Sequence, residues 1–395
     1  MRRIGLVFGL SAVLSACGAP EAPAPDADAP RLIPVAFADL PDWSTDRHAS
    51  ALDAFRETCR RWRAGDPSKS ASTTLTPMAT RGDLAAPCAD AAAVRGDGAA
   101  RAFFETWFQP FAVIAEGSDE GLFTGYYEPQ LRASPERTPT YAHPLYRLPE
   151  DLVTLDLGVF RSDLRGERIV GRVDGASFVP YHDRGAIMDG ALTARALEIA
   201  WLEDPVEAFF LQIQGSGRLV YPDGRTLRVS YAGKNGRPYA SIGRALVKRG
   251  EITLAEASAQ RIKRWVAENP SQARDLLATN ESFVFFTTRE DDGKGPIGAQ
   301  GAPLTAGRSM AVDRSYIPLG LPIWLDLPYA GAPGDRIRQL VVAQDVGGAI
   351  KGPIRGDFYW GSGDRAGEFA GRMKSRGRYF VLLPRGLAAQ LTPTS

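Results

Sequence analysis

The C-terminal part of the chain consists of short strand-like segments divided by glycine and proline. From Phe283 onward these segments include "SMAVDRSYIPLGLPIWLDLP", "QLVVAQDVGGAI", "DFYWGSG" and "RYFVLLP". Short apolar runs that are rich in β-branched and aromatic residues, and that end at turn-forming residues, are typical of the strands of a small barrel. This pattern predicts a small β-barrel in the C-terminal part of the protein.

The N-terminal part has a helical pattern instead. Within residues 45–65, apolar side chains recur at steps of three and four: Leu52, Phe55, Cys59 and Trp62. That spacing predicts an amphipathic helix with Cys59 on its buried face. A second helix is expected over residues 100–108. The expected fold class is therefore α+β, mainly β with helices at the N-terminus.

The middle of the chain mixes both patterns. Residues 209–217, "FFLQIQGSG", alternate in polarity, so we expect a strand from which Gln212 and Gln214 point outward on one face. Thr253 and Glu256 form a capping box, which predicts a helix through "AEASAQRIKRWVAENP". A short helix over "SQARDLLATN" should follow. The chain is long for one core, and at ~100–200 residues per domain two domains are expected.

Residues 1–16 have the pattern of an export signal. Arg2 and Arg3 precede an uncharged apolar run over residues 4–16. This run is too short for a transmembrane helix of ~20 residues but suits the apolar region of a signal peptide. It ends in "LSAC", which resembles the bacterial lipobox, where the signal is cut before a cysteine that then carries lipid.

Cys17 is therefore predicted to be a lipid anchor, and the membrane contact is expected to run through that lipid alone. Residues 17–33 are rich in alanine, proline and acids, which predicts a semi-extended tether without a core. Gly18 follows the cysteine where an aspartate would commonly retain a lipoprotein in the inner membrane. The expected location is the outer membrane, with the body facing the periplasm.

Charge and motifs exclude several classes of function. The formal net charge is +1, and it becomes −1 once a signal with Arg2 and Arg3 is removed, which argues against nucleic-acid binding and against electrostatic docking on anionic lipid. The chain lacks the phosphate-binding, zinc-protease and nucleophile-elbow motifs. The histidines His48, His143 and His182 are scattered and match no metal pattern. We therefore expect neither a metal nor a cofactor.

Two cysteines, Cys59 and Cys88, remain in the body besides the proposed anchor. An even pair in an oxidising compartment predicts a disulfide between them. Two unrelated buried thiols are the alternative.

Several segments, taken in order, carry a resemblance to a known family. They are "FTGYYEPQL", "FFLQIQGSGRL", "YAGKNGRPYASIGRAL", "NESFVFF", "AVDRSYIPLG", "AQDVGGAIKG" and "RGDFYWGSG". The last three resemble the three-aspartate domain of bacterial cell-wall enzymes. Over most of the chain the whole set resembles the membrane-bound lytic murein transglycosylase A family.

The resemblance implies a double-psi β-barrel domain with a second β domain inserted into it and a glycan strand in the groove between them. The barrel domain would comprise residues 34–124 plus 285–390, and the insert residues 125–284. The implied activity is non-hydrolytic cleavage of the β-1,4 bond between N-acetylmuramic acid and N-acetylglucosamine in peptidoglycan, which leaves 1,6-anhydromuramic acid ends. Peptidoglycan strands are the expected partner.

Asp357 is the expected catalytic residue. A hydrolase that cuts a glycosidic bond normally needs two carboxylates. In a lytic transglycosylase the muramic acid 6-hydroxyl is the nucleophile, so one carboxyl can act first as acid and then as base. Such an acid needs a raised pKa, which the adjoining aromatic run 358–360 favours through desolvation. The resemblance also assigns the catalytic role to this position.

The other two aspartates of these segments have expected supporting roles. Asp313 precedes a turn-prone segment, where an aspartate often accepts backbone N–H groups, so a structural role is expected. Asp345 is either a structural acceptor or a groove residue that orients Asp357 or binds sugar hydroxyls. Lys351 either pairs with a carboxylate of the site or is a solvated surface residue.

The insert is expected to form the other wall of the groove. Tyr126 and Tyr127, which follow Gly125, offer faces for a sugar ring, although neighbours in a strand point opposite ways and one of the two tyrosines should lie in the core. The amides of Gln212 and Gln214 offer donors and acceptors for N-acetyl and hydroxyl groups. We count all five positions as expected substrate-binding residues.

Two other functions remain open on the sequence alone. An inverting hydrolase on the same barrel would use Asp357 as acid and Asp345 or another carboxylate, such as Glu128, as base at a separation of ~6.5–9.5 Å. A non-catalytic lipoprotein that grips peptidoglycan would keep the groove and show no turnover.

Overall fold

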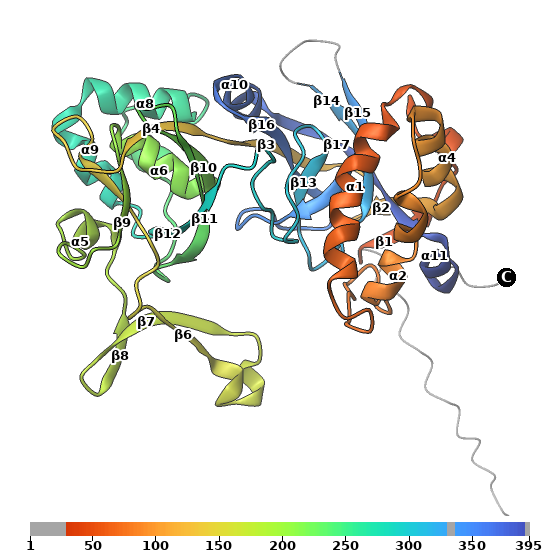
Figure 1. The fold of residues 1–395 in the computed structure, drawn as a ribbon, viewed down its shortest axis with the longest axis horizontal. Helices are drawn as coiled ribbons and strands as arrows, with labels where there is room; N and C mark the ends of the chain where they lie inside the picture. Colours follow the sequence, from red (N-terminus) through yellow and green to blue (C-terminus); the bar gives the residue numbers. More distant parts are fainter. Residues whose placement is uncertain (1–28, 330–335, 392–395) are drawn as a thin grey trace, which may run out of the picture.

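The computed structural model describes residues 29–329 and 336–391. The expected signal over residues 1–16, the expected anchor Cys17 and most of the expected tether lie outside the described residues. Within the described part, the protein has two lobes side by side and a small projecting sheet (Figure 1). No helix of this part is both long and apolar enough to cross a bilayer. The fold mixes helix and sheet, and sheet predominates.

The first lobe is built on an eight-stranded sheet that closes on itself. Its strands, in spatial order, are β1 (Arg31–Pro34), β2 (Phe108–Ile114), β17 (Lys374–Pro384), β14 (Pro322–Pro328), β15 (Arg336–Asp345), β13 (Ser309–Val312), β16 (Arg355–Ser362) and β3 (Gly121–Glu128). Strand β3 also pairs with β17, so the strands from β17 round to β3 form a ring. The sheet therefore joins segments from both ends of the chain.

Helices cover this sheet. They are α1 (His48–Arg63), α2 (Arg81–Ala85), α3 (Cys88–Ala91), α4 (Asp97–Trp107), α10 (Asp364–Arg372) and α11 (Arg385–Leu391), with the 3-10 turns η1 (Phe37–Asp39) and η2 (Trp43–Thr45). The amphipathic helix predicted over residues 45–65 is confirmed as α1, and Leu52, Phe55, Cys59 and Trp62 are all buried. The helix predicted over residues 100–108 is α4, which begins three residues earlier.

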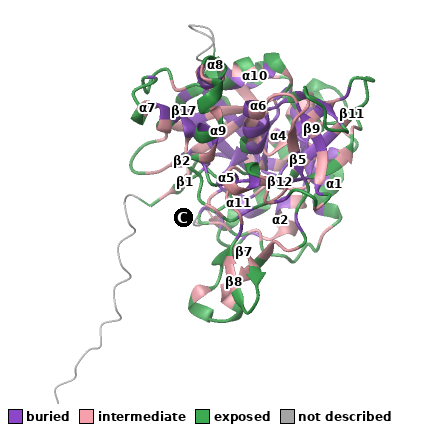
Figure 2. Ribbon diagram, turned by 90° about the vertical axis from the view of Figure 1, so that its left-hand side faces the viewer, coloured by how far each residue is buried: buried purple, intermediate pink, exposed green. Residues whose placement is uncertain are grey.

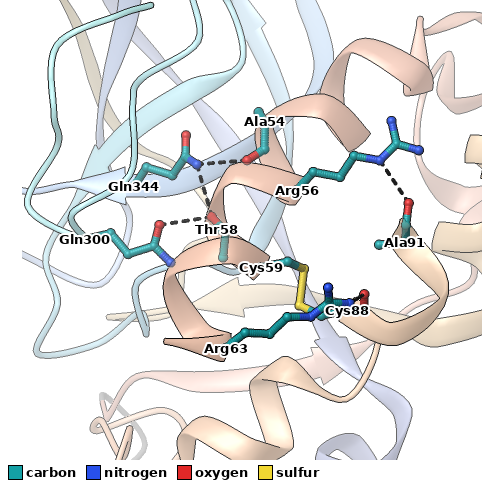
Figure 3. Close-up of a disulfide and its surroundings, with 9 residues drawn as sticks. All are labelled: Ala54, Arg56, Thr58, Cys59, Arg63, Cys88, Ala91, Gln300 and Gln344. Carbon is teal, nitrogen blue, oxygen red and sulfur yellow. Dashed lines mark hydrogen bonds between the residues drawn. A yellow bond between two sulfur atoms is a disulfide. The ribbon is translucent and has the colours of Figure 1, made fainter. Parts of the chain in front are cut away.

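A disulfide joins Cys59 of α1 to Cys88 of α3 (Figure 3). The same helix is tied to the sheet by Gln344, whose Nε2 donates to Ala54 O at 2.9 Å and to Thr58 Oγ1 at 3.0 Å. Because Gln344 immediately precedes Asp345, helix α1 holds the end of β15 in place.

The second lobe has its own sheet and its own buried clusters. The strands are, in spatial order, β12 (Val284–Glu290), β11 (Thr226–Lys234), β10 (Ser216–Val220), β4 (Gln130–Ser134), β9 (Glu198–Leu202) and β5 (His143–Tyr146). The helices are α5 (Arg184–Met188), α6 (Pro205–Gln214), α7 (Ile242–Lys248), α8 (Ala259–Glu268) and α9 (Pro270–Ala278). Buried residues lie in the interior of both lobes (Figure 2).

A third sheet of three strands projects from the second lobe. It contains β6 (Val153–Asp156), β7 (Arg168–Asp174) and β8 (Ser177–Pro180), with the turns η3 (Leu157–Val159) and η4 (Ser162–Leu164) between β6 and β7. Most residues of β7 and β8 are exposed or half-buried, in contrast to the lobes (Figure 2).

The chain crosses between the lobes later than the sequence indicates. Strand β3 stays in the first sheet through Glu128, and β12, which begins at Val284, belongs to the second sheet through Glu290. The barrel strands therefore do not begin at Phe283, and the crossings follow the expected boundaries of residues 125 and 284 by a few residues.

The strand predicted over residues 209–217 is wrong for most of its length, because α6 runs through Gln214. The helix begins with Asp204, whose carboxylate accepts from the Val206 N–H at 2.7 Å, and with Pro205 in the first turn. It ends at Gly215, which has a positive φ of 78° that suits glycine. Capping at both ends decides the conformation of this short apolar run, whose polarity pattern fits either element.

Only the Glu256 half of the capping box of Thr253 and Glu256 forms, and it does not start the predicted helix. Glu256 Oε2 accepts from the Thr253 backbone N–H at 2.8 Å and from its hydroxyl at 2.7 Å. Helix α8 begins only at Ala259, where the Ser258 side chain accepts from Arg261 N. The helix expected over "SQARDLLATN" is α9.

Candidate active site

Asp357 lies on β16 opposite Thr124 of β3. The two strands are parallel, and their register pairs Asp357 with Thr124 and Tyr359 with Tyr126. Thr124 Oγ1 donates to Asp357 Oδ1 at 2.6 Å. Because side chains alternate along a strand, these four residues project from the same face of the sheet.

The environment of Asp357 raises its pKa from 3.8 to about 6, chiefly because burial disfavours the charged carboxylate. The negative charge of Asp345 acts in the same direction, whereas the Thr124 hydrogen bond and the positive charge of Arg355 lower the pKa. A carboxyl group with this pKa is protonated in roughly one molecule in ten at pH 7, far more often than an ordinary aspartate. It is therefore suited to general acid catalysis.

Asp345 ends β15 and lies on the same side of the barrel. Its Oδ1 accepts from the backbone N–H of Ala299 at 2.8 Å and of Val346 at 2.9 Å, and its Oδ2 accepts from the Tyr126 hydroxyl at 2.9 Å. Burial raises the pKa of Asp345, and these hydrogen bonds oppose that rise. Both oxygens of this carboxylate are thus engaged by the protein.

The aromatic surroundings of Asp357 differ from those that the sequence indicates. Tyr359 faces the site and packs on Tyr126, with ring centroids 5.2 Å apart. Phe358 and Trp360 alternate to the other face, where the Trp360 ring stacks on Phe369 of α10 at 5.1 Å. Alternation thus leaves one of the three rings of the run 358–360 on the face of Asp357.

Glu128 is engaged in a buried ion pair rather than free to act as a second catalytic carboxylate. Its side chain is fully buried, and Oε1 accepts from Arg228 Nη1 at 2.8 Å while Oε2 accepts from Ser362 Oγ at 2.6 Å. Arg228 also contacts Asp291 at 2.9 Å. This network joins β3 and β16 of the first lobe to β11 of the second.

A cleft of about 350 Å³ lies at this junction of the lobes. Tyr359, Gly361 and Ser362 of β16 line one side, and Arg218 and Arg228 of the second sheet line the other. Tyr359 is two residues from Asp357 on the same face of β16. The cleft therefore lies along the strand that carries Asp357.

Asp313 has the expected structural contacts. Its Oδ1 accepts from Ser315 N at 3.0 Å, and its Oδ2 accepts from Gly352 N at 2.9 Å, which ties the segment after β13 to the segment before β16. Lys351 is exposed, and its charge helps to lower the pKa of Asp313.

Several expected substrate-binding residues have other roles in the structure. Gln212 is buried in α6, where it accepts a hydrogen bond from Arg184 at 2.6 Å. Gly125 faces away from Asp357, and a Cβ atom there would lie 2.6 Å from Trp360 Nε1, so glycine is required for packing. Gln212 thus sits on a helix rather than on an outward strand face, and Gly125 lies on the face of β3 opposite Asp357.

The three remaining expected positions lie in different surroundings. Tyr126 faces Asp357 and Asp345, whereas Tyr127 alternates to the other face and packs near Gly367 of α10. Gln214 is half-buried at the end of α6, and its Oε1 lies 3.5 Å from the Tyr127 backbone nitrogen.

Sequence reasoning missed Thr124 and Arg355. Arg355 Nη2 donates to Thr124 Oγ1 at 2.9 Å, so the two residues form a chain of hydrogen bonds to Asp357. Both lie within the segments that carried the resemblance, but only the parallel pairing of β3 and β16 shows that they meet. Within the described residues, no group of three or more His, Cys, Asp or Glu side chains is arranged to hold a metal ion.

Comparisons with known proteins agree with this geometry. Residues 122–287 match the family described as MltA specific insert domain, and residues 308–383 match the 3D domain. The chain is 34% identical to membrane-bound lytic murein transglycosylase A of Vibrio cholerae over 281 residues, which is 69% of this chain and 68% of that protein. The protein of the same name from Escherichia coli K12 is 36% identical over 267 residues, 66% of this chain and 65% of its own length.

Solved structures share the fold over nearly the whole chain. The membrane-bound lytic murein transglycosylase of Agrobacterium tumefaciens has a TM-score of 0.81 at 35% identity, covering 92% of this chain and 100% of that chain. MltA from Neisseria gonorrhoeae has a TM-score of 0.78 at 35% identity, covering 90% and 93%. The Escherichia coli protein with bound chitohexaose has a TM-score of 0.64 at 27% identity, covering 89% and 91%. This chain therefore belongs to the membrane-bound lytic murein transglycosylase A family.

Proposed function

We infer that this protein is a lytic transglycosylase of peptidoglycan. It cleaves the β-1,4 bond between N-acetylmuramic acid and N-acetylglucosamine without water and leaves 1,6-anhydromuramic acid ends. The relatives are named for this activity, and one of them binds chitohexaose, a β-1,4 glycan. One contrast carries the mechanism. The pKa of Asp357 is raised to about 6, whereas the carboxylates of Asp345 and Glu128 accept hydrogen bonds from other protein groups.

Asp357 is the single acid and base in this mechanism. Its proton passes to the glycosidic oxygen as the bond from that oxygen to the muramic acid C1 breaks. The 6-hydroxyl of the same sugar then attacks C1 and gives its proton to the Asp357 carboxylate. The residue returns to its protonated form, and no water is consumed.

The contacts of the other carboxylates argue against an inverting hydrolase. Such an enzyme needs a second carboxylate that is free to activate water. Both oxygens of Asp345 accept hydrogen bonds, from Ala299, Val346 and Tyr126, and Glu128 is buried against Arg228. These contacts engage both carboxylates with the protein, whereas Asp357 Oδ2 has no protein partner within the described residues.

The closed sheet of the first lobe supports the double-psi β-barrel that the resemblance implies, with the inserted domain proposed to run from the end of β3 at Glu128 to the end of β12 at Glu290. The glycan is proposed to lie in the cleft at the junction of the lobes. Tyr126, whose hydroxyl donates to Asp345, and Gln214 at the end of α6 are the residues of the expected set that we propose to contact it.

Attachment to a membrane is proposed to run through lipid on Cys17, as membrane-bound relatives are named. The outer membrane, with the body in the periplasm, is the proposed location. A Cys17→Ser variant should incorporate no labelled fatty acid and should be recovered in the soluble periplasmic fraction. Labelled fatty acid on that variant would contradict the proposal.

The test of the activity is the mass of its products. Purified protein incubated with murein sacculi should release muropeptides that are lighter by one water than the corresponding reducing-end products. Release of reducing ends would show a hydrolase. Binding to sacculi without release of any muropeptide would show a non-catalytic peptidoglycan-binding protein.

A further inference from the structure

Arg355 and Asp357 are separated by one residue on β16, and the hydroxyl of Thr124 lies between their side chains. Arg355 Nη2 donates to Thr124 Oγ1 at 2.9 Å, and Thr124 Oγ1 donates to Asp357 Oδ1 at 2.6 Å. Within the described residues, Arg355 forms no ion pair, since no carboxylate oxygen lies within 4.0 Å of its guanidinium nitrogens. The guanidinium of Arg355 is therefore hydrogen-bonded to Asp357 only indirectly, through the Thr124 hydroxyl.

The direction of both hydrogen bonds follows from the chemistry of the groups. A guanidinium has only donors, so the Thr124 oxygen must accept from Arg355. Within the described residues, Asp357 Oδ1 at 2.6 Å is the one acceptor within reach of the hydroxyl hydrogen, so Thr124 donates to that oxygen. A protonated Asp357 consequently carries its proton on the other oxygen, Oδ2.

Oδ2 is also the oxygen that a substrate can reach. It has no hydrogen-bond partner within the described part of the chain. Oδ2 is also not one of the polar atoms that are both buried and without a partner. Since it has no partner, it must be exposed at the protein surface. Oδ2 is thus both the oxygen that carries the proton and the oxygen that a substrate can contact.

We propose that Arg355 and Thr124 are positioning residues that reserve Oδ1 of Asp357 as an acceptor and place the catalytic proton on Oδ2. This inference rests on the proposed transglycosylase function. In the first half of the reaction the proton leaves Oδ2 for the glycosidic oxygen, which takes the electrons of the bond to C1. In the second half the 6-hydroxyl bonds to C1 and returns its proton to Oδ2.

The relay also stabilises the carboxylate that forms between the two halves. Thr124 donates to that carboxylate throughout, and the charge of Arg355 polarises the hydroxyl. A direct Arg355–Asp357 ion pair would hold the carboxylate deprotonated, because an opposite charge in contact lowers the pKa of an aspartate. The intervening hydroxyl supplies part of that stabilisation and leaves the acid able to protonate.

Other groups also influence the pKa of Asp357, directly or through Asp345, and stay the same in every variant of the test. They are Asp345 at the end of β15, which raises the pKa of Asp357, and Tyr126 on β3, which lies against Asp345. Neither contacts the Thr124 hydroxyl, so variants of the relay leave them in place.

The test compares Thr124→Val with Thr124→Ser. Valine keeps the shape and removes the donor, whereas serine keeps the hydroxyl. A hydrogen bond to a charged group corresponds to about 10- to 100-fold in rate, so kcat of Thr124→Val should fall by that factor while KM is unchanged. The loss of the donor should also move the alkaline limb of the pH–rate profile upward by about one pH unit. Thr124→Ser should restore both quantities.

Arg355→Met provides an independent variant, because it leaves the hydroxyl and removes the group that orients it. Its kcat should fall and its alkaline limb should move upward, with KM unchanged. Thr154→Val, at an exposed position of β6, is the control for the substitution itself and should match wild type. Each variant is first shown to be folded by its thermal unfolding and by binding to sacculi.

The outcomes separate this inference from the proposed function. If the wild type releases anhydro products and Thr124→Val keeps the kcat and pH profile of the wild type, the relay has no role. If Thr124→Ser is as impaired as Thr124→Val, Thr124 acts through shape and the inference is wrong. If the wild type itself releases reducing ends, it is the proposed function that fails.

Discussion

The hydroxyl of Tyr126 donates to Oδ2 of Asp345 at 2.9 Å, which gives the two aspartates of the site different roles. Asp345 is held at both oxygens, whereas Asp357 is held only at Oδ1, by Thr124. The first aspartate is thus fixed as part of the wall of the site. Only the second has an oxygen that is free to exchange a proton with a substrate.

Replacing Asp357 with asparagine should abolish turnover, because the amide can neither supply the proton nor take it back. General acid–base assistance is worth ~10²–10⁴-fold, and we expect a loss at the top of that range or beyond it. Asp345→Asn is the matched variant and should be milder, since its remaining oxygen can still accept from Ala299 and Val346. The measurement is the rate of anhydro-muropeptide release from sacculi. A folded Asp345→Asn that is as inactive as Asp357→Asn would contradict the one-carboxylate mechanism.

The pH dependence of the wild-type enzyme should report the raised pKa of Asp357. The reaction starts from the protonated acid, so kcat/KM should fall as the pH rises through about 6 and should then decrease tenfold per pH unit. An ordinary aspartate would give this decrease near pH 4. Initial rates on soluble glycan fragments across pH 4 to 9 provide the check, and a profile that stays flat to pH 8 would refute the assignment.

The same pKa predicts that Asp357 destabilises the folded protein at neutral pH. The folded state binds the proton more tightly than the unfolded state, so the free energy of unfolding decreases as the pH rises from about 4 to about 6. Above that window Asp357→Asn should be more stable than wild type by up to about 3 kcal/mol. Urea unfolding at pH 8 and at pH 4 should show that the difference is lost at the lower pH. An equal difference at both pH values would argue against the raised pKa.

Replacing Glu128 with glutamine should destabilise the protein without changing its products. The change removes one partner of a buried ion pair with Arg228, which costs about 3 kcal/mol, the lower end of the range for such pairs, because Asp291 still faces the arginine. Asp223→Asn, which removes an exposed pair with Arg225, is the control and should leave the unfolding midpoint unchanged. Reducing ends released by Glu128→Gln, in place of anhydro ends, would mean that Glu128 takes part in the chemistry.

Loss of the disulfide should lower the free energy of unfolding, because the unfolded chain without the crosslink has more conformational entropy. Cys59 and Cys88 are 29 residues apart, and in the chain-entropy model a loop of that size is worth about 3–4 kcal/mol. A double Cys59→Ser, Cys88→Ser variant should unfold at correspondingly lower urea, and reductant should destabilise the wild type but not the variant. Non-reducing peptide maps that find both thiols free in periplasmic material would disprove the pairing there.

Elements with a strong periodic pattern of apolar residues were predictable from the sequence. Elements whose conformation depends on capping residues at their termini were not. Helix α1 follows from four apolar residues at helical spacing, because one face of it must be buried. Helix α6 carries an alternating run that resembles a strand, and only the caps at Asp204 and Gly215 distinguish the two. The outward strand position expected for Gln212 was wrong for this reason, because the residue lies in a helix.

The sequence by itself determined the family, the choice of Asp357 as the proposed acid and the pair of cysteines, because each depends on residue types at fixed places along the chain. Tertiary structure alone decided which groups surround that acid. Thr124 is 233 residues from Asp357, and the two meet only because β3 and β16 pair in one register. A shift of that register by one residue would turn Thr124 to the opposite face and leave Asp357 without its donor, since side chains alternate along a strand. Register is set by the packing of the whole barrel, and no local stretch of sequence contains it.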